Sequence, residues 1–233
     1  MMRWCRILSL CLFVLQPGIA MAGAIIGDII AVEGKVTLRD DKARKTQAEV
    51  GMGVETGQLI KTAADSTAEI SLADGAVFRI APQSTFILDD FLVQGTEARQ
   101  MTARMVTGAL QYISKPARFK TDNRRIMLAN ATASIRGTDL IAFVDSRIDA
   151  VLISGEVDLA VRSNMVRLDR RGHAVSFDSS GRFDKAVVLP DEDIEQLGER
   201  LGWEVTLPAP AEPTATAVGP IPCTLVGRRL VCS

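Results

Sequence analysis

Between residues 25 and 189 the chain consists of short stretches in which apolar and polar residues alternate, with Gly, Asp, Asn or Ser at the breaks. The alternation is visible at residues 67–72 and 156–161, and we interpret residues 151–153 as a short stretch of the same kind. A period of two places every second side chain on the same face of an extended strand, so this pattern is typical of strands that are buried on one side. The region shows no sustained helical period. The sequence therefore predicts an all-β fold.

A short unit that begins with glycine recurs in this region. Gly34, Gly75, Gly108 and Gly155 each stand before apolar residues two positions apart. We interpret each as a structural turn glycine that leads into a half-buried strand. Their spacing is too uneven for a strict solenoid repeat. The prediction for residues 23–189 is therefore a single β domain that is either solenoid-like or sandwich-like.

The N-terminus has the pattern of a secretory signal. Arg3 and Arg6 precede an apolar run at residues 7–15, and a small-x-small site at residues 20–22 follows it. These three parts together predict a signal peptide over residues 1–22, cleaved before Gly23, and hence a periplasmic protein. The run is too short for a permanent membrane anchor, and no later stretch is apolar for long enough to span a membrane.

The charge balance and the cysteine content further limit the kind of protein that this chain can be. The chain has 27 basic and 28 acidic residues, and residues 1–22 contain two of the arginines and no acid. This near balance gives no reason to expect nucleic acid or an anionic membrane as a partner. Cys5 and Cys11 lie in the signal peptide, and Leu10 before Cys11 argues against a lipoprotein. Cys223 and Cys232 remain, and a disulfide is the expectation for them in an oxidising compartment.

One helix is predicted near the C-terminus. Pro190 is followed by three acids and then by Ile194, Leu197 and Leu201 at helical spacing, and Gly202 can end the helix. We expect a helix at residues 191–201, within an end cap at 190–206, that shields an apolar edge of the β domain. Residues 207–222 form a Pro/Ala/Thr linker.

Residues 223–233 are predicted to form a disulfide-closed β-hairpin. Gly227 and Arg228 supply a two-residue loop with glycine first, as a type II′ turn requires. Cys223 then falls opposite Cys232 on a non-hydrogen-bonded pair, where the Cα atoms approach to about 4.5 Å and a disulfide can form. The other expected pairs are Thr224 with Val231, Leu225 with Leu230, and Val226 with Arg229.

Six segments between about residues 27 and 161 match, in order, motifs of one known family. They are Val32-Glu33-Gly34-Lys35-Val36; Gly57 to Thr62 with Ala64 to Ile70; Leu72-Ala73-Asp74-Gly75-Ala76-Val77 with Ile80 to Ser84; Gly108-Ala109-Leu110; Ile135-Arg136-Gly137-Thr138-Asp139-Leu140; and Ser154-Gly155-Glu156-Val157. On these segments the chain resembles the FecR domain, which is named after the iron-citrate regulator.

The resemblance implies a periplasmic β module that binds something. The family's regulators have a cytoplasmic anti-sigma segment, one membrane helix and a periplasmic part, and they relay the state of an outer-membrane receptor to a sigma factor. This chain has a predicted signal peptide where those first two parts would stand.

Residues suited to catalysis are scarce. His173 is the only histidine, so a His/Cys metal site cannot be assembled, and no nucleophile elbow is present. Adjacent residues on a strand point to opposite faces, so we expect the carboxyl groups within Asp40/Asp41 and within Asp89/Asp90 to point apart. Asp191 and Asp193 lie at the start of the predicted helix. After removal of Trp4, Trp203 and Tyr112 are the single Trp and Tyr, which argues against an aromatic sugar-binding platform. We expect no catalytic residue, metal or cofactor.

The cluster of residues that most strongly suggests a specific role is at residues 136–139. Gly137 permits a bulge or a positive φ, and Arg136 and Asp139 could pair across it. One interpretation makes Arg136, Thr138 and Asp139 a partner-contact loop; the other makes the segment a turn that closes a coil, with Gly137 structural. A basic run of Arg167, Arg170 and Arg171 either meets an anionic partner or belongs to a solvated face.

The sequence thus favours a non-catalytic periplasmic FecR-domain protein. The leading hypothesis is a protein-binding or scaffold module, with a role in envelope signalling and an envelope protein as partner. The alternative is a structural or adhesion-related envelope protein that binds polysaccharide.

Overall fold

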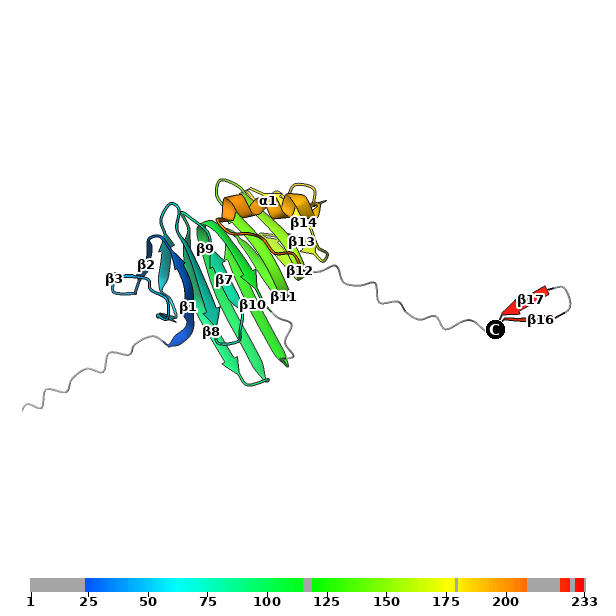
Figure 1. The fold of residues 1–233 in the computed structure, drawn as a ribbon, viewed down its shortest axis with the longest axis horizontal. Coiled ribbons are helices and arrows are strands. Elements are labelled where there is room, and N and C mark those ends of the chain that lie inside the picture. The colour runs from blue at the N-terminus through cyan, green and yellow to red at the C-terminus, as the bar shows by residue number, and fades with distance from the viewer. Residues whose placement is uncertain (1–23, 115–118, 179, 209–222, 227–228, 233) are drawn as a thin grey trace, which may run out of the picture.

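A computed structural model describes residues 24–114, 119–178, 180–208, 223–226 and 229–232, in which fifteen strands join into one hydrogen-bonded sheet (Figure 1). One helix, α1 (Asp191–Leu201), lies across it, and two further strands pair with each other. The strands are β1 (Ile25–Glu33), β2 (Val36–Arg39), β3 (Lys45–Gln47), β4 (Gly53–Glu55), β5 (Leu59–Thr62), β6 (Thr67–Leu72), β7 (Val77–Ile80), β8 (Thr85–Gln94), β9 (Ala98–Ile113), β10 (Thr121–Leu128), β11 (Ala131–Val144), β12 (Ile148–Val161), β13 (Asn164–Leu168), β14 (His173–Phe177), β15 (Val187–Val188), β16 (Cys223–Val226) and β17 (Arg229–Cys232).

The long strands β9, β11 and β12 change partners halfway along and so divide the sheet into two layers. The first half of β9 pairs with β8 and β10, whereas its second half pairs with β7 and β11. Likewise, the first half of β12 pairs with β14 and its second half with β13. One layer runs β4-β1-β6-β7-β9-β11-β12-β14-β15, and the other β3-β2-β5-β8-β9-β10-β11-β12-β13. The prediction of a β fold is confirmed.

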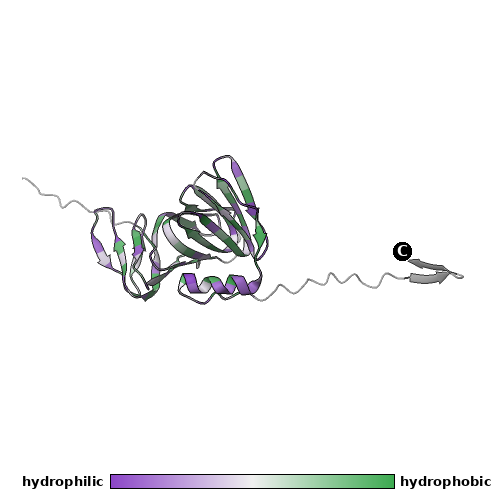
Figure 2. Cartoon of the chain, turned by 90° about the horizontal axis from the view of Figure 1, so that it is seen from above, coloured by the Kyte–Doolittle hydropathy of each residue, from purple (hydrophilic) through white to green (hydrophobic). Residues whose placement is uncertain are grey.

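The main core lies between these two layers. Phe78 on β7 and Phe86 on β8, from opposite layers, place their ring centroids 4.8 Å apart, and Tyr112 packs on Phe78 at 4.7 Å. Figure 2 shows hydrophobic residues along the central strands. Because the chain passes repeatedly from one layer to the other, the fold combines the crossings expected of a coil with the packing of a sandwich.

Three of the structural glycines lie inside strands, where the strand bends from one layer to the other. Gly108 in β9, Gly137 in β11 and Gly155 in β12 have φ of +95°, +56° and +88°. A Cβ at Gly155 would lie 2.0 Å from the carbonyl oxygen of Gly137, so the bend at Gly155 leaves no room for a side chain. The expectation that Gly108 and Gly155 precede their strands was wrong, because each strand continues through its glycine.

The other two glycines occupy connections between strands. Gly34 links β1 to β2 with φ of +66°, and Gly75 lies between β6 and β7 with φ of +79°. A Cβ at Gly34 would contact Ser66 Oγ at 2.4 Å, whereas Gly75 faces open space.

The centre of the sheet is buried on both faces. Every residue of β11 from Thr138 to Val144 is buried, and so are residues 150–153 of β12. The alternation predicted for residues 151–153 was therefore wrong. A continuous apolar run is typical of a strand that is covered on both sides, and here α1 covers the outer face.

Helix α1 begins and ends where the sequence predicted. Gly202 adopts φ of +83° and donates its amide to the carbonyl of Gly198 at 2.9 Å. Ile194 and Leu201 are fully buried against a second apolar cluster on the outer face of the sheet, which includes Ile141 and Val151. The helix thus covers a face of the sheet, not an edge as expected, because residues 150–153 present apolar side chains outward as well as inward.

The C-terminal strands pair in the predicted register, with Cys223 opposite Cys232 and Val226 opposite Arg229. The loop at 227–228, residues 209–222 of the linker predicted at 207–222, and the predicted signal peptide at 1–22 lie outside the described residues. The disulfide stays a prediction. Within the described ranges, no helix is long and apolar enough to cross a membrane.

Candidate functional site

The predicted contact loop at residues 136–139 is a bulge within β11. The register of β11 against β12 shifts between Arg136 and Asp139. Arg136 is exposed, but Thr138 is fully buried and Asp139 is 9% exposed. Thr138 and Asp139 therefore do not form a partner-contact surface, because both side chains are used inside the fold.

Thr138 ties the bulge to its neighbouring strands. Its hydroxyl donates to the carbonyl of Glu156 at 3.0 Å, and its amide donates to Ser114 Oγ at 3.1 Å. The amide of Ser114 in turn donates to the carbonyl of Thr138 at 2.9 Å. Buried polar groups that are all bonded in this way rigidify a structure.

Asp139 belongs to a polar cluster on the outer face of the sheet, which we call the outer cluster (Glu69, Arg79, Gln111, Asp139 and Trp203). Gln111 Nε2 donates to Asp139 Oδ1 at 2.9 Å, and Trp203 Nε1 donates to Gln111 Oε1 at 3.0 Å. Arg79 Nε lies 2.9 Å from Glu69 Oε1. The expected pair between Arg136 and Asp139 is replaced by the bond from Gln111.

The outer cluster holds the carboxyl group with the most distinctive environment. Burial raises the pKa of Asp139 to about 6, and neither the hydrogen bond from Gln111 nor the positive charge of Arg79 offsets it. A buried group with such a pKa marks a candidate functional site. Asp139 can therefore change its charge near neutral pH.

A second group of charged side chains lies between the layers, and we call it the inner network (Asp74, Arg99, Asp122 and Arg124). Arg99 donates to Asp122 Oδ1 at 3.0 Å and Oδ2 at 2.6 Å, and to Asp74 Oδ2 at 3.0 Å. Arg124 also donates to both oxygens of Asp122, at 2.8 and 2.9 Å. The two arginine side chains and that of Asp74 are each 1% exposed.

Opposite charges compensate for burial in the inner network. Burial alone would raise the pKa of Asp122, but hydrogen bonds from Arg99 and Arg124 lower it below its usual value. Arg124 also donates to Tyr112 Oη at 3.1 Å and to Ser114 Oγ at 2.6 Å. Through Ser114 the inner network reaches the bulge at Thr138, so the bulge lies between the two clusters.

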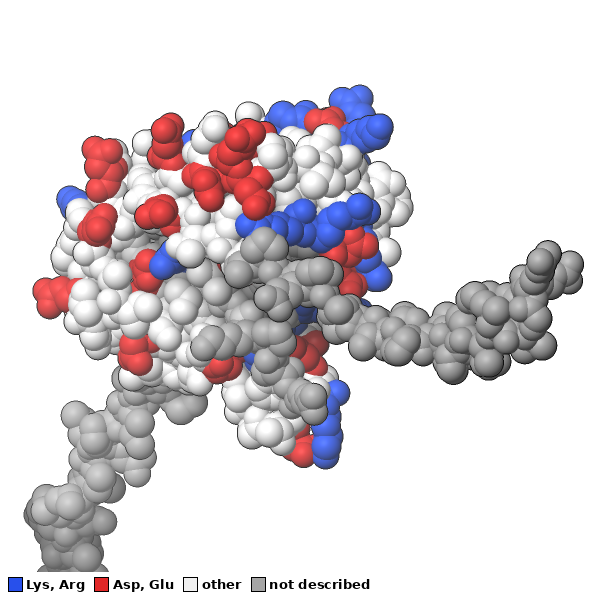
Figure 3. All heavy atoms as spheres, turned by 45° about the vertical axis from the view of Figure 1, so that its right-hand side comes forward, with Lys and Arg blue, Asp and Glu red and all other residues white. Residues whose placement is uncertain are grey.

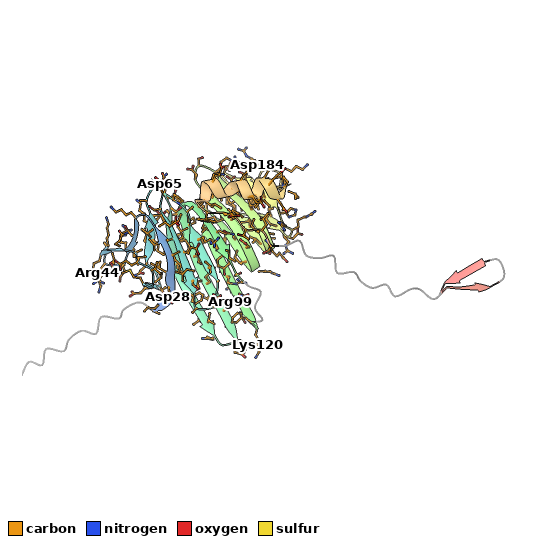
Figure 4. The ribbon with its side chains drawn as sticks, in the orientation of Figure 1. Asp28, Arg44, Asp65, Arg99, Lys120 and Asp184 are labelled. Carbon is orange, nitrogen blue, oxygen red and sulfur yellow. The ribbon has the colours of Figure 1, made fainter. Side chains whose placement is uncertain are left out.

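Sequence reasoning missed the inner network, although a signal was present. Residues 99, 101, 103 and 105 alternate toward the core, and the first of these is Arg99. Residues 124, 126 and 128 do the same, starting with Arg124. When an arginine occupies the next inward-facing position of an alternating apolar pattern, its charge is buried and requires a buried acid as partner. Figure 4 shows Arg99 among the central strands and Lys120 near the far tip of the sheet.

The other sequence candidates have structural partners. His173 Nδ1 accepts from the amide of Asp169 at 3.3 Å. Each arginine of the basic run pairs with an acid: Arg167 with Asp158, Arg170 with Asp169, and Arg171 with Asp191. On the face shown in Figure 3, basic side chains likewise lie beside acidic ones.

One acid of each of the first two acid pairs forms an ion pair with an arginine. Asp40 pairs with Arg44, and Asp89 with Arg104. Among the residues that the structure describes, no group of three or more His, Cys, Asp or Glu side chains could hold a metal ion.

A surface groove, which we call the α1 groove, runs beside the helix. Cavities of about 410 and 440 Å³ share Phe143 and Arg200 in their walls, and the Arg200 guanidinium lies 3.9 Å from the Phe143 ring centroid. The floor is apolar and the rim is charged, with Asp184 beside α1 (Figure 4). Val187 on edge strand β15 lines one end and is half exposed.

The fold and its internal polar clusters define a two-layered β module. The family model for the FecR protein matches residues 58–158. This range contains Asp74, Arg99, Asp122, Arg124 and Asp139, so both clusters lie largely within it. The resemblance predicted from the sequence motifs is confirmed by this match.

Two crystal structures of a "putative anti-sigma factor" from Parabacteroides distasonis are similar to the chain at 12% sequence identity. The structure at 1.65 Å resolution matches with a TM-score of 0.47 over 58% of this chain and 62% of its own, and the one at 2.50 Å with 0.48 over 60% and 63%. The chain therefore spans less than two thirds of their length. No protein with a curated description matches the chain.

Proposed function

We propose that this protein is an exported, non-catalytic FecR-domain module that binds another envelope protein and takes part in envelope signalling. The observation that carries the proposal is the FecR match at residues 58–158. The family's regulators work in relay across the envelope by protein contact, and the N-terminal pattern of this chain predicts export.

The placement of the polar side chains supports a binding role. The acids and arginines of the two clusters bond mainly to one another, and His173 bonds to a neighbouring backbone amide. A general acid or base must reach a substrate, and these groups are engaged in holding the fold. The protein acts through its surface.

The α1 groove is where we expect the partner to bind. Its apolar floor, formed by Phe143, Ala150, Val151 and Ala174, and its charged rim have the anatomy of a protein interface. Val187 supplies an exposed apolar side chain at its border.

Site-specific photo-crosslinking tests this proposal in intact cells. A photoreactive phenylalanine analogue replaces Val187 at the groove, and Met165 serves as the matched control because it is also an exposed apolar residue on an edge strand. We expect a protease-sensitive adduct of discrete mass from position 187 and none from 165. Adducts that resist protease but yield to glycan digestion would support polysaccharide binding instead, and an absence of adducts at both positions would contradict the groove as the contact.

Export is tested separately by intact mass. We expect the protein in the periplasmic fraction with its N-terminus at Gly23. An unprocessed N-terminus, or a lipid on Cys11, contradicts this part of the proposal.

A further inference from the structure

Asp139 lies at the meeting point of the sheet and the C-terminal segment. Its neighbours across the strands are Ile113 on β9 and Ser154 on β12. Its carboxylate accepts a hydrogen bond from Gln111. We call residues 191–207 the C-terminal cover, because Ile194, Leu201 and Val205 of this segment are buried against the outer face of the sheet.

Gln111 links Asp139 to the cover in a fixed direction. The indole N–H of Trp203 can only donate, so Gln111 must present its oxygen to Trp203 and its NH₂ group to Asp139. Trp203 follows Gly202, the residue that ends α1. One amide therefore connects the carboxyl group to the residue that follows the end of the helix.

The charged groups around Asp139 do not neutralise it. Arg79 on β7 acts on it through space, but Arg79 is itself paired with Glu69 on β6. Strand β9 contributes the neutral Gln111, strand β12 has Ser154 opposite, and the cover contributes the neutral Trp203, followed by an exposed Glu204. Ionisation of Asp139 would therefore leave a buried carboxylate that accepts its hydrogen bond from the neutral amide of Gln111.

We propose that Asp139 is a proton-operated latch that holds the C-terminal cover closed when it is neutral and loosens it when it is ionised. A buried neutral carboxyl is tolerated, whereas a buried carboxylate favours any opening that admits water. The inference concerns the cover alone and stands whether or not the α1 groove binds a partner.

The direction of the pH dependence follows from linkage. Burial places the pKa of Asp139 at about 6 in the closed form, and opening returns it toward its ordinary value of 3.8. Protons thus bind more tightly to the closed form, so closure is strongest below about pH 4 and weakens up to about pH 6. The opening equilibrium should increase by roughly 100-fold over the whole titration, from about pH 3 to about pH 7.

Two measurements on the full chain test the latch. With Trp4→Phe, Trp203 is the only tryptophan, and its fluorescence should titrate with a midpoint near pH 6. Hydrogen exchange of the cover, corrected for the intrinsic rate, should report the rise in opening of roughly 100-fold, whereas the β8–β9 hairpin should not change.

Variants assign the titrating group. Asp139→Asn should abolish both responses, whereas His173→Ala, which removes the only histidine, should preserve them. Arg79→Met should move the midpoint upward, because Arg79 lowers the pKa of Asp139; this variant serves if Asp139→Asn does not fold. Persistence of the titration in Asp139→Asn, its loss in His173→Ala, a downward shift in Arg79→Met, or pH-independent exchange of the cover would each overturn the proposal.

Discussion

Asp122 in the inner network, whose side chain is 25% exposed, and the buried Asp139 in the outer cluster have pKa values that are shifted in opposite directions. Two arginines donate to both oxygens of Asp122, and its pKa is lowered. Asp139 accepts from an amide, and its pKa is raised to about 6. Burial by itself favours the neutral acid, so the hydrogen-bond partners decide which charge state the fold prefers. Asp122 in the inner network therefore stays charged near neutral pH, whereas Asp139 in the outer cluster changes its charge near pH 6.

The largest expected effect is on the inner network. Arg99→Leu would leave Asp74 buried without its guanidinium partner and remove two of the bonds to Asp122. Breaking a buried pair in this way should lower the free energy of unfolding by about 3–5 kcal/mol, measured by urea denaturation.

Arg104→Leu is the matched control for Arg99→Leu. Arg104 lies on the same strand and pairs with Asp89, but its side chain is 46% exposed. An exposed pair should contribute less than about 1 kcal/mol. Equal losses of unfolding free energy from the two variants would show that the buried pairs of the inner network stabilise the fold no more than an exposed pair does.

The second prediction contrasts the pH dependence of the two regions. The folded-state pKa of Asp139 is above its ordinary value, so its stabilising contribution is complete below about pH 4 and is lost as pH rises through about 6. The loss is up to about 3 kcal/mol. Asp122 has the opposite sign, because its lowered pKa stabilises the fold above about pH 4 and this is lost in acid.

Asp139→Asn isolates the outer contribution. The variant should match the wild type near pH 4 and unfold at higher denaturant concentration than the wild type at pH 7. A stability difference that does not vary with pH would show that Asp139 does not titrate in the folded protein.

The third prediction concerns the bulge that joins the two regions. Gly137 has φ of +56°, where a β-branched residue is strained. Gly137→Val should destabilise by about 1–3 kcal/mol, measured as a lower melting temperature. Gly51→Ala is the control, because that glycine also has positive φ (+88°) but faces open space. An unchanged melting temperature in Gly137→Val would mean that the backbone does not require glycine there.

The smallest expected effect is at the end of the outer cluster. Trp203→Phe keeps an aromatic ring but removes the donor to Gln111 Oε1. The loss of one hydrogen bond should cost about 1 kcal/mol, measured by urea denaturation at pH 5. A loss of unfolding free energy as large as that of Arg99→Leu would show that the outer cluster contributes as much to stability as the inner network.

Local patterns determined much of this fold. Alternation predicted the strands, the spacing of Ile194, Leu197 and Leu201 predicted α1, and the symmetry around residues 227–228 predicted the pairing of Cys223 with Cys232. Each of these signals lies within about a dozen consecutive residues, where backbone geometry relates sequence directly to structure. The FecR motifs, which extend over a longer range, were also sufficient for the family.

Only the tertiary structure decided how these elements meet. Residues 151–153 are all apolar, and they are buried on both faces because α1 packs on the outer side of the sheet. Arg99 meets Asp74 and Asp122 because strands far apart in the chain become neighbours. Thr138 and Asp139, which the sequence suggested as surface residues, are buried. Thr138 bonds to Glu156 on the neighbouring strand, and Asp139 bonds to Gln111 in the outer cluster. The sequence by itself determined which segments form strands, helix and turns, since these follow from short-range geometry; burial, charge partners and the acidity of Asp139 depend on long-range packing, which no local pattern specifies.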